Sequence, residues 1–275
     1  QFAKYIENNY EDWYEQPDMD RPVLSHEIFK KYIIPKLKIE DDTSYLVIVV
    51  DNLRYDQWKV LQPEIQEYYN LVKENLYYSI LPTATQYSRN AIFSGLTPYE
   101  MKKQHPEFWR DDVDEGLKNE FEFEFLEAQL KRFRLDINAE YVKISGANDG
   151  EKFLRNIKQY KNNKITTLVY NFIDMLSHAR TDSKIMRELS ANDQSYRDIT
   201  KAWFKNSSLK EIIKAAKQQG LKLIITTDHG TVEVKRASTV IGDKETSLNL
   251  RYKTGKSLTF QEKDVYYVPN PSKIG

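Results

Sequence analysis

The sequence predicts an α/β fold in which a mainly parallel sheet is flanked by helices. Continuous runs of β-branched and other apolar residues at 44–50, 165–173 and 221–227 are typical of strands that are buried on both faces. Segments whose apolar residues recur at helical spacing separate these runs. Strands that alternate with helices form parallel sheets, and 275 residues suffice for one large domain of this kind or two small ones.

Residues 1–40 are predicted to form a helical linker segment that precedes the main domain at 41–275. Within it, the stretch SHEIFKKYIIPKL (25–37) carries apolar residues at helical spacing. The alternative is that the same residues form the first helices of the domain itself. Because the chain does not begin with Met, we expect it to be a fragment of a longer protein.

The segment after the first strand is predicted to lead into a cap. Residues 54–75 are expected to be helical, and LYYSIL (76–81) is expected to be a second strand, followed by a turn that opens another helix. Residues from about 100 to 140 are rich in charged and aromatic side chains. We therefore expect them to form a helical cap insertion outside the sheet.

The second half of the chain continues the alternation of strands and helices. AEYVKI (139–144) predicts a short strand and GEKFLRNIKQYKN (150–162) predicts a helix. Residues 183–219 are expected to be mostly helical and to end with Gly220 as the glycine after the helix end. The stretches at 251–257 and 264–271 are expected to form hairpin-like pieces.

Charge and cysteine content exclude several classes of protein. The 41 basic residues balance 41 acidic ones, so no global field favours nucleic acid or a membrane. No apolar run approaches the roughly 18 residues of a membrane helix, and the N-terminal stretch lacks the features of a signal peptide. The absence of cysteine excludes disulfides and thiolate zinc sites. We expect a cytoplasmic protein without membrane insertion.

Three of the predicted strands lead directly into an aspartate, namely Asp51, Asp174 and Asp228. Ligands of parallel sheets bind beyond the carboxyl ends of the strands, so these three carboxylates are expected to lie at one edge. A single aspartate in this position most often caps the following helix. Three of them, two with a histidine nearby, indicate a binding site instead.

Two histidines accompany these carboxylates. Asp174 and His178 are four residues apart, so a helix would place both on one face. Asp228 and His229 are adjacent, and in a turn they can reach one site or two. Carboxylate oxygen combined with imidazole nitrogen suits zinc or manganese better than calcium or magnesium. A cation would also offset the repulsion among clustered carboxylates.

The turn PTATQYSRN (82–90) supplies hydroxyl groups at the start of a predicted helix. Thr83 and Thr85 lie where free backbone N–H groups attract anions. A threonine hydroxyl becomes nucleophilic when a base or a metal lowers its pKa. The alternative is that one of these hydroxyls only caps the helix.

Four stretches in this order resemble the motif series of the alkaline phosphatase superfamily: VVDNLRYDQW, ILPTATQYSRNAIFSG, LVYNFIDMLSHAR and IITTDHGT. Within that superfamily they are most similar to the PglZ domain, and in particular to the effector domain of PorX-type response regulators, which are linked to type IX secretion. The resemblance extends from about residue 40 to the C-terminal end and implies an alkaline phosphatase-like core.

The resemblance implies a centre with two zinc ions. Asp51, Asp228 and His229 correspond to ligands of one metal. Thr85 corresponds to the nucleophile, which also bridges toward both metals, and Thr83 is the alternative nucleophile.

Asp174 and His178 correspond to two ligands of the second metal. Members of the superfamily supply a further histidine from a segment nearer the C-terminus, and this sequence has no histidine after His229. The second site is therefore expected to be incomplete in this chain, and activity of the chain alone is in doubt on that ground.

The implied reaction is phosphoryl transfer. Two zinc ions about 4 Å apart would clamp the phosphoryl group, and Thr85 would attack phosphorus in line. Arg54 and Arg89 are expected to hold the non-bridging oxygens through paired hydrogen bonds, with Asn90 as a further candidate. For Arg54 the alternative is a surface ion pair with Asp56.

The function expected from these motifs is that of a zinc-dependent phosphodiesterase or phosphatase. The 19 tyrosines and 12 phenylalanines can stack on bases, which favours a phosphodiester substrate of nucleotide or oligonucleotide type. As the output domain of a two-component response regulator, the chain would follow a receiver domain. Its partners would be secretion-system or transcription-regulatory proteins, or a second copy of itself. The alternative is a regulatory module that binds proteins or dimerises, with a degenerate or single metal site.

Overall fold

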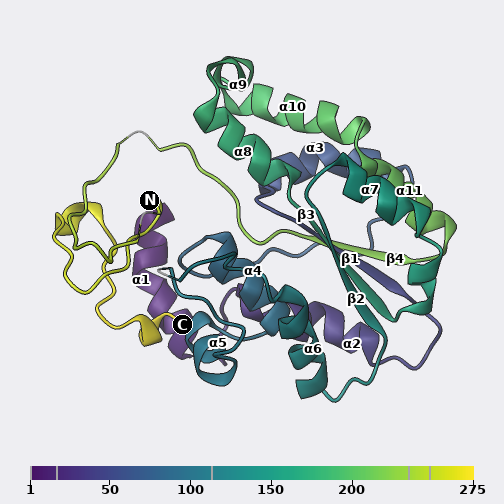
Figure 1. The fold of residues 1–275 in the computed structure, drawn as a ribbon, viewed down its shortest axis with the longest axis horizontal. Coiled ribbons are helices and arrows are strands. Elements are labelled where there is room, and N and C mark those ends of the chain that lie inside the picture. The colour runs from purple at the N-terminus through teal and green to yellow at the C-terminus, as the bar shows by residue number, and fades with distance from the viewer. Residues whose placement is uncertain (1, 17, 113, 235, 248) are drawn as a thin grey trace. The chain divides into compact units, whose positions relative to one another are not determined.

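A computed structural model describes residues 2–16, 18–112, 114–234, 236–247 and 249–275 (Figure 1). Positions 1, 17, 113, 235 and 248, which fall in the predicted linker, cap and C-terminal segments, lie outside the described residues. The chain forms two compact units. The sheet unit comprises Ile34–Asn75 and Leu130–Thr231, and the helical unit comprises Gln1–Ile33, Leu76–Gln129 and Val232–Gly275.

The sheet unit contains one parallel sheet. Its strands are β1 (Tyr45–Val50), β2 (Ala139–Ile144), β3 (Ile165–Tyr170) and β4 (Lys222–Thr226), and every pairing between them is parallel. Their order across the sheet is β2-β3-β1-β4. Because β1 and β3 lie between neighbours, all of their residues are buried, as their continuous apolar runs indicated. The predicted α/β class with a mainly parallel sheet is confirmed.

Helices connect these strands and flank the sheet (Figure 1). Leu46, Ile48 and Val50 of β1 share one hydrophobic core with residues of four helices, α3 (Tyr55–Gln66), α7 (Ala147–Arg155), α10 (Asp193–Lys205) and α11 (Ser208–Gln218). Each buried aliphatic side chain of this kind stabilises the fold by roughly 1.5–3 kcal/mol. The helical elements of the sheet unit are α2 (Ile34–Leu37), α3 (Tyr55–Gln66), α7 (Ala147–Arg155), the 3₁₀ turn η3 (Gln159–Asn162), α8 (Phe172–Asp182), α9 (Lys184–Leu189), α10 (Asp193–Lys205) and α11 (Ser208–Gln218).

The strand predicted at 165–173 is three residues shorter in the structure. β3 ends at Tyr170, Asn171 takes the position before the helix, and α8 begins at Phe172. Asp174 therefore lies in the first turn of a helix rather than at the end of a strand. A carboxylate is favourable there because the N-terminus of a helix carries partial positive charge.

Two helix ends in the sheet unit test the predicted boundaries. The helix expected over 54–75 ends at Gln66, where the backbone N–H groups of Tyr68 and Tyr69 both donate to the Ile65 carbonyl and close the last turn. Gly220 has a φ of 77° directly after the last turn of α11, which confirms its predicted position after the helix end.

The predicted helical character of residues 1–40 and of residues 100–140 is confirmed, since both segments contain helices. The roles of these segments as a linker and as a cap stay predictions. The chain passes between the two units at four places, and one of them, between residues 129 and 130, falls within α6 (Glu122–Arg132). The helical elements of this unit are α1 (Phe2–Glu15), the 3₁₀ turn η1 (Ser25–Glu27), the π-helix η2 (Phe29–Ile33), α4 (Thr85–Ser94), α5 (Pro98–Gln104), α6 (Glu122–Arg132), and the 3₁₀ turns η4 (Glu262–Asp264) and η5 (Pro271–Lys273).

The prediction of a strand at LYYSIL (76–81) is wrong. Tyr78 forms only an isolated parallel bridge with Leu24. The backbone N–H groups further along the segment donate to side chains of the N-terminal region: Ile80 to Ser25 Oγ at 3.1 Å and Leu81 to Tyr10 Oη at 2.9 Å. Side-chain oxygens thus accept the backbone hydrogen bonds that a neighbouring strand would accept in a sheet.

The predicted hairpin-like pieces near the C-terminal end are also wrong. In the described part of 232–275, strand pairing is limited to a single antiparallel bridge between Ile241 and Thr259. Side chains hold this region instead. The Asp112 carboxylate accepts hydrogen bonds from the hydroxyl groups of Tyr87, Tyr252 and Thr254 at 3.2, 2.9 and 3.0 Å.

Because several tyrosines are buried, we expect the fold to lose stability at alkaline pH. Burial raises the pKa of Tyr10, Tyr87, Tyr170 and Tyr252, and it raises the pKa of Tyr69 to about 12. The folded state therefore keeps protons that the unfolded chain loses from about pH 10 upward. The contribution of these tyrosines to the free energy of unfolding should be constant below that pH and should fall by up to about 1.4 kcal/mol per pH unit for each such tyrosine above it.

Urea unfolding between pH 8 and pH 11 measures this loss, and Tyr69→Phe is the matched variant. Tyr69 donates to the Leu221 carbonyl at 2.9 Å, so the variant should be about 1 kcal/mol less stable at pH 8. Above pH 10 its stability should fall less steeply than that of the wild type. A free energy of unfolding that stays constant to pH 11 would contradict the prediction.

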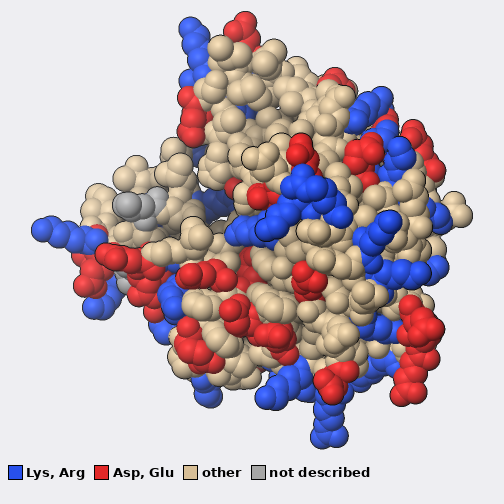
Figure 2. Space-filling view, turned by 45° about the vertical axis from the view of Figure 1, so that its right-hand side comes forward, with Lys and Arg blue, Asp and Glu red and all other residues tan. Residues whose placement is uncertain are grey.

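None of the helices in the described part of the chain combines the length and the apolar character that crossing a bilayer requires. Lys and Arg side chains are intermixed with Asp and Glu over the face drawn in Figure 2. This distribution agrees with the balance of 41 basic and 41 acidic residues in the sequence.

Candidate metal centre

The centre begins at the turn that follows β1. The backbone N–H of Asp51 donates to the Tyr170 carbonyl at 3.0 Å, which continues the β1–β3 ladder by one residue. Asn52 then has a φ of 63°, in the left-handed region. Asparagine tolerates this conformation better than most residues other than glycine. The chain turns sharply here, and Asp51 is left at the end of the strand.

A second turn, after β4, is joined to the first by hydrogen bonds. The backbone N–H of Asn52 donates to Asp228 Oδ1 and that of Leu53 donates to Thr227 Oγ1, both at 3.0 Å. Asp228 Oδ1 also accepts from the backbone N–H of His229 at 2.9 Å, and Thr227 Oγ1 donates to the His229 carbonyl at 2.9 Å. These bonds fix the two strand ends relative to each other.

Asp174 reaches the same place from the first turn of α8. Its Oδ1 accepts a hydrogen bond from Asn52 Nδ2 at 3.0 Å. Its Oδ2 lies 3.4 Å from Nε2 of His178, one turn further along the helix. The expectation that α8 places Asp174 and His178 on one face is therefore confirmed. His178 is at the exposed side of the pair, since 75% of its side chain is accessible to solvent against 23% for Asp174.

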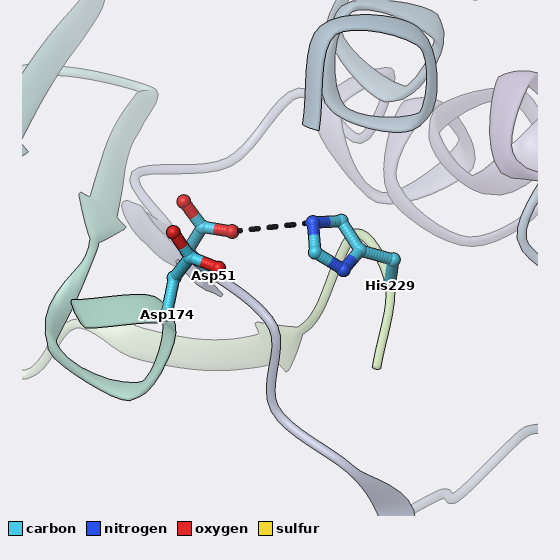
Figure 3. A group of neighbouring side chains, drawn as sticks. All are labelled: Asp51, Asp174 and His229. Atoms are coloured by element: carbon cyan, nitrogen blue, oxygen red, sulfur yellow. Dashed lines mark ion pairs between the residues drawn. The ribbon is translucent and has the colours of Figure 1, made fainter. Parts of the chain in front are cut away.

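The sheet edge thus gathers two carboxylates and an imidazole into one group (Figure 3). One potential ligand atom from each of Asp51, Asp174 and His229 lies within 4.8 Å of the other two. Asp51 Oδ1 is 3.6 Å from His229 Nε2, and Asp228 Oδ2 is 3.8 Å from the same nitrogen. Asp51, Asp228 and His229 are buried. The predicted convergence of the three aspartates at one edge is confirmed.

The orientation of His229 favours metal binding through Nε2. Its Nδ1 lies 3.4 Å from the Gly230 carbonyl. A carbonyl only accepts hydrogen bonds, so this contact is a hydrogen bond in the tautomer that carries the proton on Nδ1. The lone pair is then on Nε2, the atom that faces Asp51. A backbone carbonyl commonly fixes a ligating histidine in this way.

The spacing and the donor types suit a metal ion. Two ligand atoms that are each about 2.1 Å from a tetrahedral zinc ion are about 3.4 Å apart, and the Asp51–His229 pair is separated by 3.6 Å. Gathering carboxylates in a buried site is unfavourable unless a cation or several donors compensate them. The group of Asp51, Asp174 and His229 can therefore hold a metal ion, with Asp228 beside it.

Arg54 adopts the ion-paired alternative in this structure. Its guanidinium donates from Nε and Nη2 to the two oxygens of Asp56, at 2.9 and 2.6 Å, and from Nη1 to Asp193 at 2.8 Å. Both carboxylates belong to the sheet unit. A role of Arg54 in substrate binding stays a prediction, and it would require the arginine to exchange one of these carboxylates for a phosphate.

Thr83 and Thr85 belong to the helical unit, on either side of the start of α4. Thr85 is the first residue of α4, and Ala84 occupies the N-cap position. The alternative that one of these threonines is the N-cap of the helix is therefore wrong. The Thr83 carbonyl accepts a hydrogen bond from Arg251 Nη1 at 2.6 Å, which fixes the backbone of the turn. The nucleophilic role of Thr85 stays a prediction.

Arg89 and Asn90 lie deep inside the helical unit. Each has only 1% of its surface exposed. Arg89 Nε donates to Oε1 of Glu122, which is equally buried, and Asn90 Nδ2 donates to the Lys118 carbonyl at 3.1 Å. These contacts give both residues a structural role. Their roles in substrate binding stay predictions.

Sequence reasoning missed Asn52 and Thr227. Asn52 donates hydrogen bonds to two of the three aspartates. The Thr227 hydroxyl accepts from the backbone N–H of Leu53 and donates to the carbonyl of His229. The only signal in the sequence was the position of each residue beside an aspartate at a strand end. An asparagine directly after such an aspartate is a reasonable candidate for a left-handed turn.

Comparison with known proteins places the chain in a family. Residues 28–275 match the family described as the BREX system PglZ alkaline phosphatase-like domain. The match includes the whole sheet unit and therefore every residue of the candidate metal centre. No curated protein matches the sequence.

Proposed function

The chain belongs to the PglZ family of alkaline phosphatase-like domains, and from this membership we propose that it is a zinc-dependent hydrolase of phosphoric esters. The observation that carries the proposal is the group of Asp51, Asp174 and His229 at the carboxyl edge of the sheet, in which Asp51 and His229 are buried. An active site is expected at that edge of a parallel sheet. Mixed carboxylate and imidazole donors are typical of zinc.

We assign the proposed ligands to two metal positions. Asp51, Asp228 and His229 would hold one zinc ion, and Asp174 with His178 would contribute to a second. When bound, zinc supplies positive charge that lowers the pKa of a hydroxyl group and neutralises phosphoryl oxygens. The 3.4 Å separation of Asp174 and His178 supports their joint use as ligands.

Thr85 is the proposed nucleophile. Its hydroxyl proton leaves to solvent, and its Oγ forms a bond to phosphorus while the bond from phosphorus to the leaving alcohol breaks. Water then attacks the phosphothreonine, restores the Thr85 hydroxyl and releases the phosphate product. The position of Thr85 in the first turn of α4 supports this role, because backbone N–H groups at a helix N-terminus attract a phosphate.

The proposed substrate is a phosphodiester of nucleotide type. Tyr55, Tyr99 and Tyr267 are each about half exposed, at 49, 50 and 55%, and exposed rings of this kind can stack on bases. Following the resemblance to PorX-type effector domains, the chain would act in the cytoplasm as the output domain of a response regulator. A receiver domain would precede it. Secretion-system or transcription-regulatory proteins, or a second copy of the chain, would be its partners.

A regulatory module with a single metal site is the second candidate function. In the described part of the chain, one group of side chains meets the spacing for a metal, and it contains one histidine. A protein that uses such a metal for structure rather than for catalysis would bind zinc but would not turn over phosphodiesters. Metal content and turnover, measured together, separate the two functions.

We expect the purified protein to contain zinc and to lose thermal stability when a chelator removes it. A ligand present at about 100 times its dissociation constant stabilises a protein by about 2.7 kcal/mol, which corresponds to roughly 5–10 °C in a chain of this size. Elemental analysis and thermal unfolding with and without chelator measure both effects. Asp51→Asn should lower the zinc content and should abolish the thermal response to chelator.

Asp193→Asn is the matched control, because Asp193 pairs with Arg54 and is 52% exposed. It should bind zinc like the wild type. Wild-type protein that contains neither zinc nor manganese after growth in their presence, and whose melting temperature does not respond to chelator, would exclude the proposed function.

A further inference from the structure

We propose that Asn52 is a positioning residue of the metal centre, which orients the carboxylates of Asp174 and Asp228 at the same time. The inference rests on the proposed function, since it concerns the same centre. Asn52 follows Asp51 directly and is buried, with only 1% of its surface exposed.

Asn52 contacts the two aspartates through different groups. Its backbone N–H donates to Asp228 Oδ1, and its side-chain Nδ2 donates to Asp174 Oδ1, each at 3.0 Å. A carboxylate only accepts hydrogen bonds, so the amide must present nitrogen rather than oxygen to Asp174. One residue therefore links the turn after β1 to the turn after β4 and to the first turn of α8. A movement of Asp174 or Asp228 breaks a hydrogen bond unless Asn52 moves as well.

The backbone conformation of Asn52 makes this double contact possible. Its φ of 63° turns the backbone N–H toward Asp228 while the side chain extends toward Asp174. Glycine would adopt this conformation with less strain, but it would have no amide to offer Asp174. The presence of asparagine is therefore explained by the side chain and not by the backbone alone.

The other side-chain atom of Asn52 also indicates the metal centre. Asn52 Oδ1 is buried and has no hydrogen-bond partner in the part of the chain that the structure describes. The oxygen and nitrogen of an amide are about 2.2 Å apart, so this oxygen lies within about 5 Å of Asp174 Oδ1. A buried acceptor of this kind requires a donor, and water in a filled centre would provide it.

Asn52→Gly separates the side chain of Asn52 from its backbone. The variant keeps the left-handed turn and the N–H that donates to Asp228, and it removes the contact with Asp174. Zinc affinity is measured by competition with a chromophoric chelator. We expect a 10- to 100-fold loss of affinity, as is usual when a residue that orients metal ligands is removed.

Arg134→Gly is the matched control. Arg134 has the other positive φ among the non-glycine residues described, 58°, and lies outside the centre. It should bind zinc like the wild type. Wild-type affinity in Asn52→Gly would overturn the inference and reduce Asn52 to a turn residue. A wild-type protein that binds no zinc would instead overturn the proposed function, and the inference with it.

Asn52→Asp supplies a second test that does not depend on how Asn52→Gly folds. Aspartate keeps the shape of asparagine and tolerates the left-handed turn, but it replaces the Nδ2 donor with an oxygen that repels Asp174. The protein is loaded with Co²⁺, whose visible spectrum reports the ligand geometry. We expect a spectrum that differs from that of the wild type. An unchanged spectrum would show that Asn52 does not position Asp174 and would overturn the inference.

Discussion

Thr85→Val is expected to lower kcat for bis(4-nitrophenyl) phosphate by roughly 10³-fold or more, as removal of a nucleophile does in other covalent hydrolases. Valine has nearly the size of threonine, and Thr85 is not the N-cap of α4. The fold should therefore tolerate the change. Since the proposed zinc ligands of the sheet unit are untouched, the zinc content should fall little compared with the loss of turnover.

Thr83→Val is the control that separates the two candidate nucleophiles. Thr83 is held through its carbonyl, which accepts from Arg251, and valine keeps that carbonyl. If Thr85 is the nucleophile, Thr83→Val should keep at least a tenth of the wild-type turnover. A loss confined to Thr83→Val would move the nucleophile to that residue. Full activity in both variants would exclude a covalent threonine route.

The parts of the fold that could be predicted are those decided by local sequence. β1 and β4 match the predicted strands to within one residue at each end, and β2 matches AEYVKI in full. Each is an apolar or alternating run bounded by polar residues, and its position in the sheet determines its burial. The family match likewise confirms the PglZ resemblance that rested on four motifs in order.

The parts that could not be predicted depend on contacts between distant residues. LYYSIL has the composition of a strand, but its backbone donors pair with Ser25 and Tyr10, which lie 55 and 71 residues away. Asn52 acts through partners that are 122 and 176 residues away. Neither set of contacts leaves a periodic pattern in the sequence. The aspartates of the centre were predictable because each follows a strand end or opens a helix.

The second large effect is expected in the helical unit, where Arg89→Met should lower the free energy of unfolding by about 3–5 kcal/mol. Arg89 and Glu122 form an ion pair, and each side chain has only 1% of its surface exposed. Glu122 also accepts from Asn119 Nδ2 at 3.0 Å. Removing the guanidinium leaves a buried carboxylate without its counterion, and this is far more costly than losing a surface pair. Urea unfolding at pH 7 measures the change.

The double variant Arg89→Met/Glu122→Leu decides whether the pair is structural or serves the substrate. Replacing both charges with apolar side chains often restores the stability that the single change removes, so the double variant should unfold near the wild-type urea concentration. If Arg89 only supports α4, the turnover of bis(4-nitrophenyl) phosphate should recover with the fold. If Arg89 also holds a phosphate oxygen, stability should recover while kcat/KM stays low. A single variant Arg89→Met that is as stable as the wild type would contradict the buried ion pair itself.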